Sequence, residues 1–183
     1  MARFFQEVTK THQAFIENQK IFFVCTAPEA GRLSLSPKGM DSFLCLSPHE
    51  AAFLNVTGSG NETAAHLKEN GRITVMFCSF DEKPLILRLY GHAEAIHPNH
   101  EDWERLYNLF QPLPGARQII KIKIESVQTS CGESIPFYEF QGHRDSLNQW
   151  AIQKGPEGVA AYQQQKNRKS IDGLDTGLNP QET

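Results

Sequence analysis

Alternating apolar and polar residues predict a series of short β-strands in the first two thirds of the chain. The alternation is cleanest from Arg117 to Val127, where isoleucines at 120, 122 and 124 face one side and charged residues at 121, 123 and 125 face the other. Other β-rich or alternating runs lie at 21–27, 32–36, 43–46, 51–56, 72–80 and 85–96. About six or seven strands joined by short turns predict a mainly β protein, and closure into a barrel would remove exposed sheet edges.

Helical spacing predicts several helices around this barrel. The expected helices lie within residues 1–20 and at 64–70, 99–110, 145–153 and 156–167, the last two separated at Gly155-Pro156. Residues 169–183 contain turn residues and little to bury, so we expect this tail to be ordered only in part unless it docks on a partner. The expected fold class is therefore a β-barrel with peripheral α-helices.

Length, charge and cysteine content narrow the classes of partner. With 183 residues, the chain is long enough for one domain with a substantial core and too short for two. The net charge of −3 leaves no broad basic excess, which argues against nucleic acid as the main partner. No stretch approaches the roughly 20 apolar residues of a membrane span, and the first residues lack the apolar run of a signal peptide. The four cysteines form no C-x-x-C pair, and buried reduced thiols would favour a cytoplasmic location.

The stretch VTGSGNET, residues 56–63, allows two local interpretations. Its glycines precede a predicted helix, and the unpaired amides at a helix N-terminus suit a phosphate group. Alternatively, Ser59 and Glu62 have the spacing of a capping box, in which Ser59 caps the helix and Glu62 reaches back to the amide of Ser59. The seven histidines show no spacing that supplies a third metal ligand, so no metal site is expected.

The order of motifs resembles that of the pyridoxamine 5′-phosphate oxidase-like family. The motifs are GRLSLSPKG, VTGSGNET, AAHLKENG, RITVMF and LRLYGHAEAI, and the resemblance covers about residues 20–130. The stretch from PFYEF to NRKSIDGLDTG is similar to a bacterial and fungal branch of the family. The resemblance implies an FMN-binding split barrel, a homodimer with the cofactor pocket at the subunit interface, and a small-molecule ligand. We therefore expect a single domain, 1–183, with a barrel core at about 20–130, a helical extension at about 137–168 and a tail at 169–183.

The resemblance also implies a set of cofactor-binding residues. Thr57, Gly58 and Gly60 match the family frame, whereas Glu62 and Thr63 stand where relatives often have an arginine and a lysine that grip the FMN phosphate. Three cations are candidates to replace that charge, although each has an alternative role as a solvated surface residue: Arg32, Lys38 and Arg88. The full set of expected cofactor-binding residues is Arg32, Ser36, Lys38, Thr57, Ser59, Asn61, Thr63 and Arg88.

Two functions follow from these observations. The first is an FMN-dependent oxidoreductase of this family, with unknown catalytic residues and an unknown substrate. The second is a non-catalytic split-barrel binding module that has lost tight FMN binding or binds another ligand such as haem. The absence of the two cations at Glu62 and Thr63 favours the second function, because each missing charge-assisted hydrogen bond is worth roughly 1.5–3 kcal/mol.

Overall fold

The computed structural model describes residues 2–178. Within this part, the chain forms eight strands and four helices. The strands are β1 (Arg3–Phe5), β2 (Phe22–Thr26), β3 (Ser34–Lys38), β4 (Phe43–Ser47), β5 (Glu50–Val56), β6 (Arg72–Cys78), β7 (Ile86–Ile96) and β8 (Ala116–Ser130). The helices are α1 (Lys10–Asn18), α2 (Glu62–Asn70), α3 (Trp103–Tyr107) and α4 (Ser146–Lys166).

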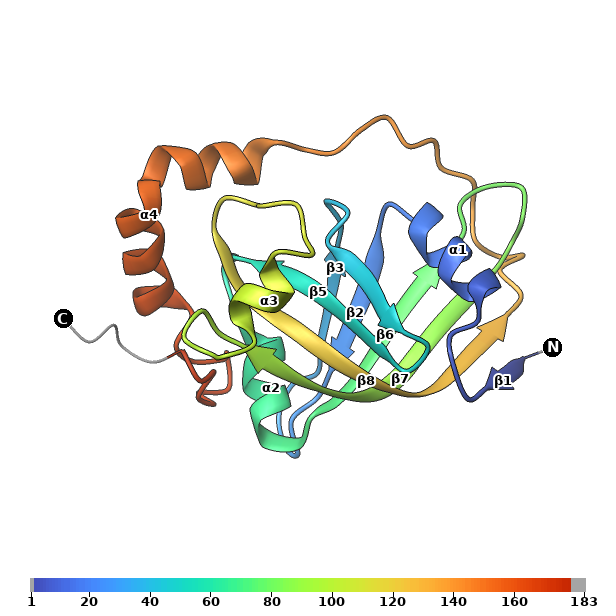
Figure 1. The fold of residues 1–183 in the computed structure, drawn as a ribbon, viewed down its shortest axis with the longest axis horizontal. Coiled ribbons are helices and arrows are strands. Elements are labelled where there is room, and N and C mark those ends of the chain that lie inside the picture. Colours follow the sequence, from blue (N-terminus) through green and yellow to red (C-terminus); the bar gives the residue numbers. More distant parts are fainter. Residues whose placement is uncertain (1, 179–183) are drawn as a thin grey trace.

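The strands form one antiparallel sheet that curls into an open barrel. Its order is β3-β2-β6-β7-β8-β5-β4, and β1 adds to the far end of β8. Because β3 and β4 lie at the two ends of this order and do not pair with each other, the barrel stays split between them. Figure 1 shows the long strands β7 and β8 crossing the molecule, with α4 and α2 at one end and β1 at the other. The predicted split barrel is therefore confirmed.

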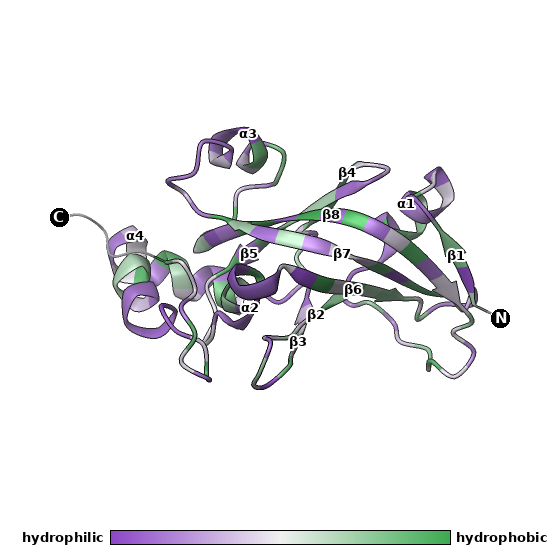
Figure 2. Cartoon of the chain, turned by 90° about the horizontal axis from the view of Figure 1, so that it is seen from below, coloured by the Kyte–Doolittle hydropathy of each residue, from purple (hydrophilic) through white to green (hydrophobic). Residues whose placement is uncertain are grey.

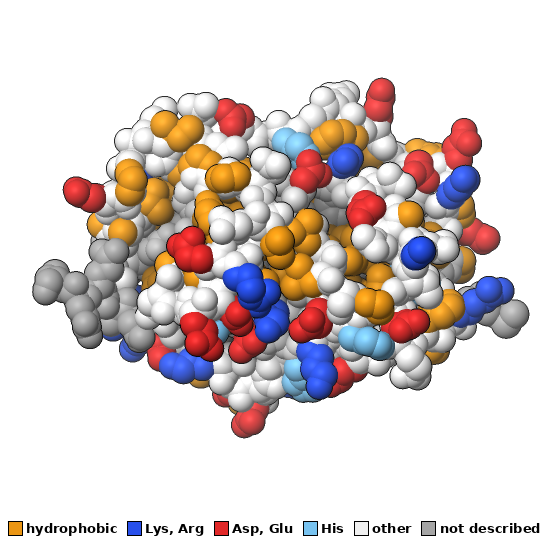
Figure 3. Space-filling view, in the orientation of Figure 1, with side chains coloured by type: hydrophobic (Ala, Val, Ile, Leu, Met, Phe, Trp, Pro, Cys, Tyr) orange, Lys and Arg blue, Asp and Glu red, His pale blue; other side chains and the backbone are white. Residues whose placement is uncertain are grey.

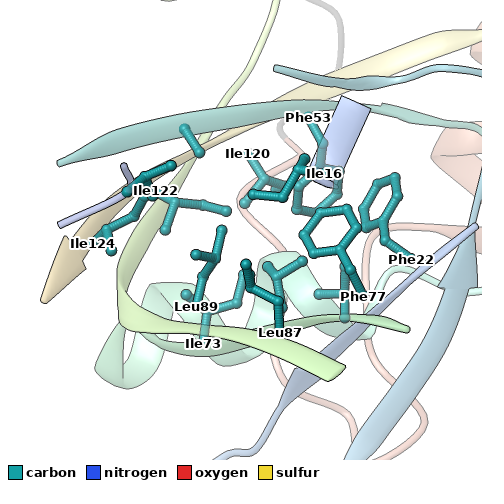
Figure 4. Packing of buried hydrophobic residues seen from close by; sticks show 14 of the residues in the cluster. Ile16, Phe22, Phe53, Ile73, Phe77, Leu87, Leu89, Ile120, Ile122 and Ile124 are labelled. Carbon is teal, nitrogen blue, oxygen red and sulfur yellow. The ribbon is translucent and has the colours of Figure 1, made fainter. Parts of the chain in front are cut away.

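The interior of the barrel holds the main hydrophobic core. The predicted inward side of β8 is confirmed, since Ile120, Ile122 and Ile124 are at most 3% exposed. Figure 4 shows Ile122 and Ile124 across from Leu89 and Ile73, and Ile120 nearer the aromatic rings of Phe22 and Phe77. The centroids of these two rings lie 5.6 Å apart in a stacked pair. Apolar side chains from β2, β5, β6 and β7 complete this core.

A smaller apolar cluster lies on the outer side of the sheet under α3. Ile119 of β8 packs there with Trp103 and Leu106 of α3, so neighbouring isoleucines of one strand serve two different cores. Figure 2 shows α3 and α2 on opposite sides of β7 and β8. The outer face of β8 is therefore covered near its start and exposed further along.

Two predicted helices differ from those observed. Residues 3–5 pair with β8, so Phe4 and Phe5 belong to a strand, and the first helix begins only at Lys10. The helix expected at 99–110 is shorter in the structure. It is α3, with turns on either side of it, and the chain between α3 and Pro112 is not α-helical. The predicted break in the last helix is confirmed, since Gly155 within α4 has φ of 67° and is not helical.

Charge on the surface is mixed in sign. On the face shown in Figure 3, Lys and Arg side chains lie among Asp and Glu side chains rather than in one patch. Among residues 2–178, no helix is both long enough and apolar enough to cross a bilayer.

Candidate functional site

The glycine loop, Thr57–Asn61, joins β5 to α2 and is fixed at its first residue. The amide and the hydroxyl of Thr57 both donate to the carbonyl of Gly115 at 2.8 Å, and Gln163 of α4 donates to the same hydroxyl at 2.7 Å. Within residues 2–178, and apart from Gly58 and its two chain neighbours, no heavy atom lies within 4 Å of the position that a Cβ on Gly58 would take. The loop is therefore anchored at one end and has an open side at its first glycine.

The start of α2 differs from the predicted capping box. The helix begins at Glu62 with Asn61 as its N-cap, and the side chain of Asn61 does not cap it. The first helical hydrogen bond runs from the amide of Ala65 to the carbonyl of Asn61, so the amides of residues 62–64 have no acceptor within the helix. Ser59 lies exposed in the loop, outside the helix. The prediction that Ser59 and Glu62 cap each other is wrong.

The chain after α4, residues 167–177, folds back onto the glycine loop, and we name it the C-terminal segment. Glu62 accepts a hydrogen bond of 3.0 Å from the amide of Ile171, so its carboxylate is engaged rather than free. Asn167 and Thr176 are at most 1% exposed. Figure 1 shows this red part of the chain beside α2. The expectation of a partly ordered tail is thus wrong for this segment, because it docks on its own chain; residues 179–183 lie outside the described part.

Acidic residues of the C-terminal segment also pair with nearby cations. Asp172 accepts from both the amide and the guanidinium of Arg32, and Asp175 pairs with Lys68 of α2. The backbone amide of Arg32 holds the pKa of Asp172 below its ordinary value, and the guanidinium of Arg32 lowers it further by a smaller amount. The positive charge of Arg32 is therefore already compensated within the chain.

A row of buried polar side chains runs from β3 to the glycine loop. Lys38 donates to the side chain of Asn55 at 3.0 Å, and Asn55 pairs across the sheet with Gln118. Gln118 in turn donates to the side chain of Asn61 at 2.7 Å. Burial, followed by repulsion from Arg117, lowers the pKa of Lys38 to about 8. The row therefore begins on β3 with Lys38, whose amine bonds to a neutral amide among the described residues, and it ends at Asn61 at the base of α2.

Arg117, at the start of β8, is a second buried cation of this region. Its Nη1 donates to the carbonyl of Gly60 at 3.0 Å and to the side-chain oxygen of Asn167 at 2.7 Å, while its buried Nε has no hydrogen-bond partner among the described residues. Burial lowers the pKa of Arg117 to about 10, so the guanidinium stays charged at neutral pH. No carboxylate in residues 2–178 pairs with it, and its charge is therefore uncompensated.

The other predicted residues are distributed over both faces of the sheet. Ser36 lies on the same side of β3 as Lys38, half-buried, with its hydroxyl 3.4 Å from that of Ser34. Thr63 is 5% exposed in the first turn of α2. Arg88 lies between two core leucines of β7 and so points outward, where it donates to Ser130 at 3.3 Å. Of the predicted residues, Thr57 and Asn61 are thus part of the glycine loop, and Lys38 is connected to it through the polar row. Arg88 lies away from the loop.

A groove of about 1140 Å³ adjoins this row on the β3 side. Lys38 and Phe23 line it on the sheet side, and Tyr138, Phe140 and Arg144 line it from the segment that crosses from β8 to α4. Small-molecule sites have volumes of about 300–1,000 Å³ and are mostly apolar with a few polar groups. Lys38 therefore lies where a ligand-sized groove meets the polar row.

The profile of the pyridoxamine 5′-phosphate oxidase family matches residues 8–131, which is most of the chain. This chain belongs to the pyridoxamine 5′-phosphate oxidase family. A curated relative, the pyridoxamine 5′-phosphate oxidase family protein ustO of Aspergillus flavus, is 36% identical over 195 residues, covering 95% of this chain and 77% of its own. The matched region includes the glycine loop and both buried cations.

Solved structures of the same fold are more distant in sequence. HupZ of Group A Streptococcus is 20% identical with a TM-score of 0.52, covering 66% of this chain and 91% of its own. An FAD-binding protein from Mycobacterium smegmatis is 10% identical with a TM-score of 0.51, covering 68% of this chain and 96% of its own. These similarities show the fold of this chain.

The sequence could not single out Arg117 or Asn167 as parts of the site. Arg117 looks like the first residue of an alternating strand, and Asn167 lies in a polar stretch at the end of a helix. Both are brought to the glycine loop by contacts across more than 50 and 100 residues of sequence, respectively. No local signal distinguishes Arg117, because charged residues also alternate along the rest of this strand.

Proposed function

We propose that this protein binds FMN at the glycine loop and is a homodimeric FMN-dependent oxidoreductase. The observation that carries the proposal is the charge of Arg117, which lies buried behind the loop without a carboxylate partner in the described chain. A buried cation that only neutral oxygens satisfy attracts an anion to its surroundings. Membership of the family and the FAD-binding relative from Mycobacterium smegmatis support flavin as the class of ligand.

Residues of this chain fit the two parts of FMN. The unpaired amides at the start of α2 and the hydroxyl of Thr63 suit the phosphate, backed by the charge of Arg117. Lys38, which lines the groove, suits the polar edge of the ring system, and the aromatic side chains of the groove offer apolar surface to the ring. When bound, FMN supplies hydride or electron transfer, and the protein positions it.

A second copy of the chain would complete the pocket. Leu35 of β3 is 66% exposed on the face that points away from the core, and Leu33, just before β3, is 73% exposed. Two large exposed apolar side chains at an edge strand form a surface that association would bury. We place the partner subunit there, and we propose a cytoplasmic location, because all four cysteines are free thiols.

The test is direct. The purified protein is titrated with FMN and with riboflavin, which lacks the phosphate, and its visible absorption is recorded before any addition. We expect flavin absorption or tight FMN uptake, and a preference of FMN over riboflavin. A colourless protein that takes up neither flavin would overturn the proposal and favour a binding module for another ligand.

A further inference from the structure

Asn167 connects the end of α4 with both sides of the glycine loop. Its side-chain amide donates to the carbonyl of Gly58 at 3.0 Å, and its side-chain oxygen accepts from Arg117 at 2.7 Å. Its backbone carbonyl accepts from the side chain of Asn61 at 3.2 Å and from the hydroxyl of Thr176 at 2.7 Å. Asn167 is fully buried, and three of these bonds are buried as well, whereas the bond to the carbonyl of the exposed Gly58 is partly buried.

These bonds determine which way the peptide groups of the loop point. The carbonyl of Gly58 points toward Asn167, and the carbonyl of Gly60 points toward Arg117. No peptide bond in the described chain is cis, and in a trans peptide the N–H points opposite to the C=O. The two amides that follow these glycines therefore point away from α4, toward the open side of the loop.

The neutral side chain at position 167 also determines the charge behind the loop. An aspartate there would form an ion pair with Arg117, and its charge would be cancelled inside the protein. The asparagine satisfies the guanidinium with a neutral oxygen and leaves its charge in place. The side-chain nitrogen of Asn167 is a hydrogen-bond donor, which an aspartate lacks, and it donates to the carbonyl of Gly58.

We infer that Asn167 is the positioning residue of the phosphate site: it turns the loop amides outward and leaves the charge of Arg117 available to the phosphate. This inference rests on the proposed function, because it concerns the phosphate of the same ligand. Under this inference, the first residue of the C-terminal segment takes over a role that the family resemblance assigns to two cations at the start of α2. Asn167 shapes the loop without touching the ligand itself.

The experiment compares the binding of FMN and riboflavin to three forms of the full-length protein. The variant Asn167→Asp keeps the shape of the side chain, removes one donor and cancels the charge of Arg117. The control Gln165→Glu adds the same charge to an exposed position of α4 two residues earlier. Calorimetry gives the dissociation constants, and circular dichroism and thermal unfolding report whether each variant is folded.

We expect Asn167→Asp to weaken FMN binding about tenfold, which is the loss of roughly one charge-assisted interaction, and to leave riboflavin binding unchanged. Gln165→Glu should bind both flavins as the wild type does. Equal loss of FMN and riboflavin would show a general structural defect and overturn the inference. Unchanged FMN binding by the aspartate variant would overturn it while the proposed function stands, whereas a wild type that binds no FMN overturns both.

A second variant keeps the inference testable if Asn167→Asp does not fold. Thr176→Val is nearly isosteric and removes only the hydroxyl that holds the backbone carbonyl of Asn167. We expect it to loosen the loop and weaken FMN binding about threefold, again without an effect on riboflavin. FMN affinity equal to that of the wild type in this folded variant would contradict the inference.

Discussion

The carboxylate of Glu62 and the backbone amide of Ile171 form a hydrogen bond of 3.0 Å, which ties the first turn of α2 to the C-terminal segment. The family resemblance implies a cation at the position of Glu62, and this acidic residue would be expected to repel a phosphate at the glycine loop. The bond orients one carboxylate oxygen toward the segment instead. It lowers the repulsion without removing the charge, since a hydrogen-bonded carboxylate remains anionic.

Glu62→Gln should therefore tighten FMN binding. The amide oxygen of glutamine can still accept the bond from Ile171, and the repulsive charge is gone. We expect FMN affinity to rise about threefold, with riboflavin affinity unchanged, as measured by calorimetry. Glu82→Gln, at an exposed position of the turn between β6 and β7, is the matched control. Equal FMN affinity in the Glu62 variant and the wild type would show that no phosphate approaches the start of α2.

The barrel could be predicted from the sequence because its pattern is local. The isoleucines of β8 alternate with charged residues, and the period of two fixes which side is buried before any partner strand is known. The break at Gly155 was likewise encoded by two adjacent residues that interrupt a helix. Motif order then identified the family.

The arrangement at the site could not be predicted because it depends on contacts between distant segments. Glu62 offered a local partner in Ser59, but the folded chain gives it the amide of Ile171, more than 100 residues away. Arg117 shows the same limit: nothing next to it in sequence reveals that the loop carbonyl of Gly60 and Asn167 will surround it. Arg88 differs, because the alternation with the two core leucines that flank it already indicates the outer face.

The pair of Arg32 and Asp172 should hold the C-terminal segment on the glycine loop. Asp172→Asn removes the charge of this contact, and the amide and guanidinium of Arg32 lose their carboxylate acceptor. We expect faster hydrogen exchange of the amides at residues 170–176, measured by mass spectrometry, with little change in the barrel strands. Lys68→Ala should produce the same effect through Asp175. Exchange rates equal to those of the wild type would show that the buried Asn167 and Thr176, together with the bond of Ile171 to Glu62, hold the segment without these ion pairs.

The exposed Leu35 of β3 should control association. Leu35→Asp places a charge on the face where we propose the second subunit, while the core side of the strand is unchanged. We expect a shift from dimer to monomer by light scattering, with FMN binding weakened because the pocket loses its second wall. Leu109→Asp, another exposed leucine at 53% exposure, serves as the control. A dimeric Leu35→Asp protein would place the interface elsewhere.

Gly91 in β7 should be essential for barrel stability. A Cβ at this position would lie 2.0 Å from the carbonyl oxygen of Lys123 on the neighbouring strand, where the register shifts by one residue. Because backbone cannot move aside as a flexible side chain can, we expect Gly91→Ala to lower the free energy of unfolding by about 2 kcal/mol or more. Gly158→Ala, on α4, meets only the side chain of Lys154 and should raise it by up to about 1 kcal/mol. Urea unfolding of both variants measures the difference.

Lys38 should make FMN binding depend on pH above neutrality. Burial, with a smaller contribution from Arg117, lowers the pKa of this amine to about 8 in the protein without ligand. The amine is therefore charged below about pH 8 and becomes neutral as the pH rises through that value. Since only the charged form attracts an anionic ligand, FMN affinity should be highest below pH 8 and fall between about pH 8 and 10.

Two substitutions isolate the contribution of Lys38 to this dependence. Lys38→Met should bind FMN more weakly at low pH and show a flat profile, because no group of intermediate pKa remains at that position. Lys38→Arg keeps a charge that does not titrate in this range, so its profile should also be flat but at higher affinity. Calorimetric titrations from pH 7 to 9.5 measure the profiles, a range in which the ligand's phosphate is already ionised. A wild-type affinity that stays constant across this range would show that the amine of Lys38 does not contribute to FMN binding.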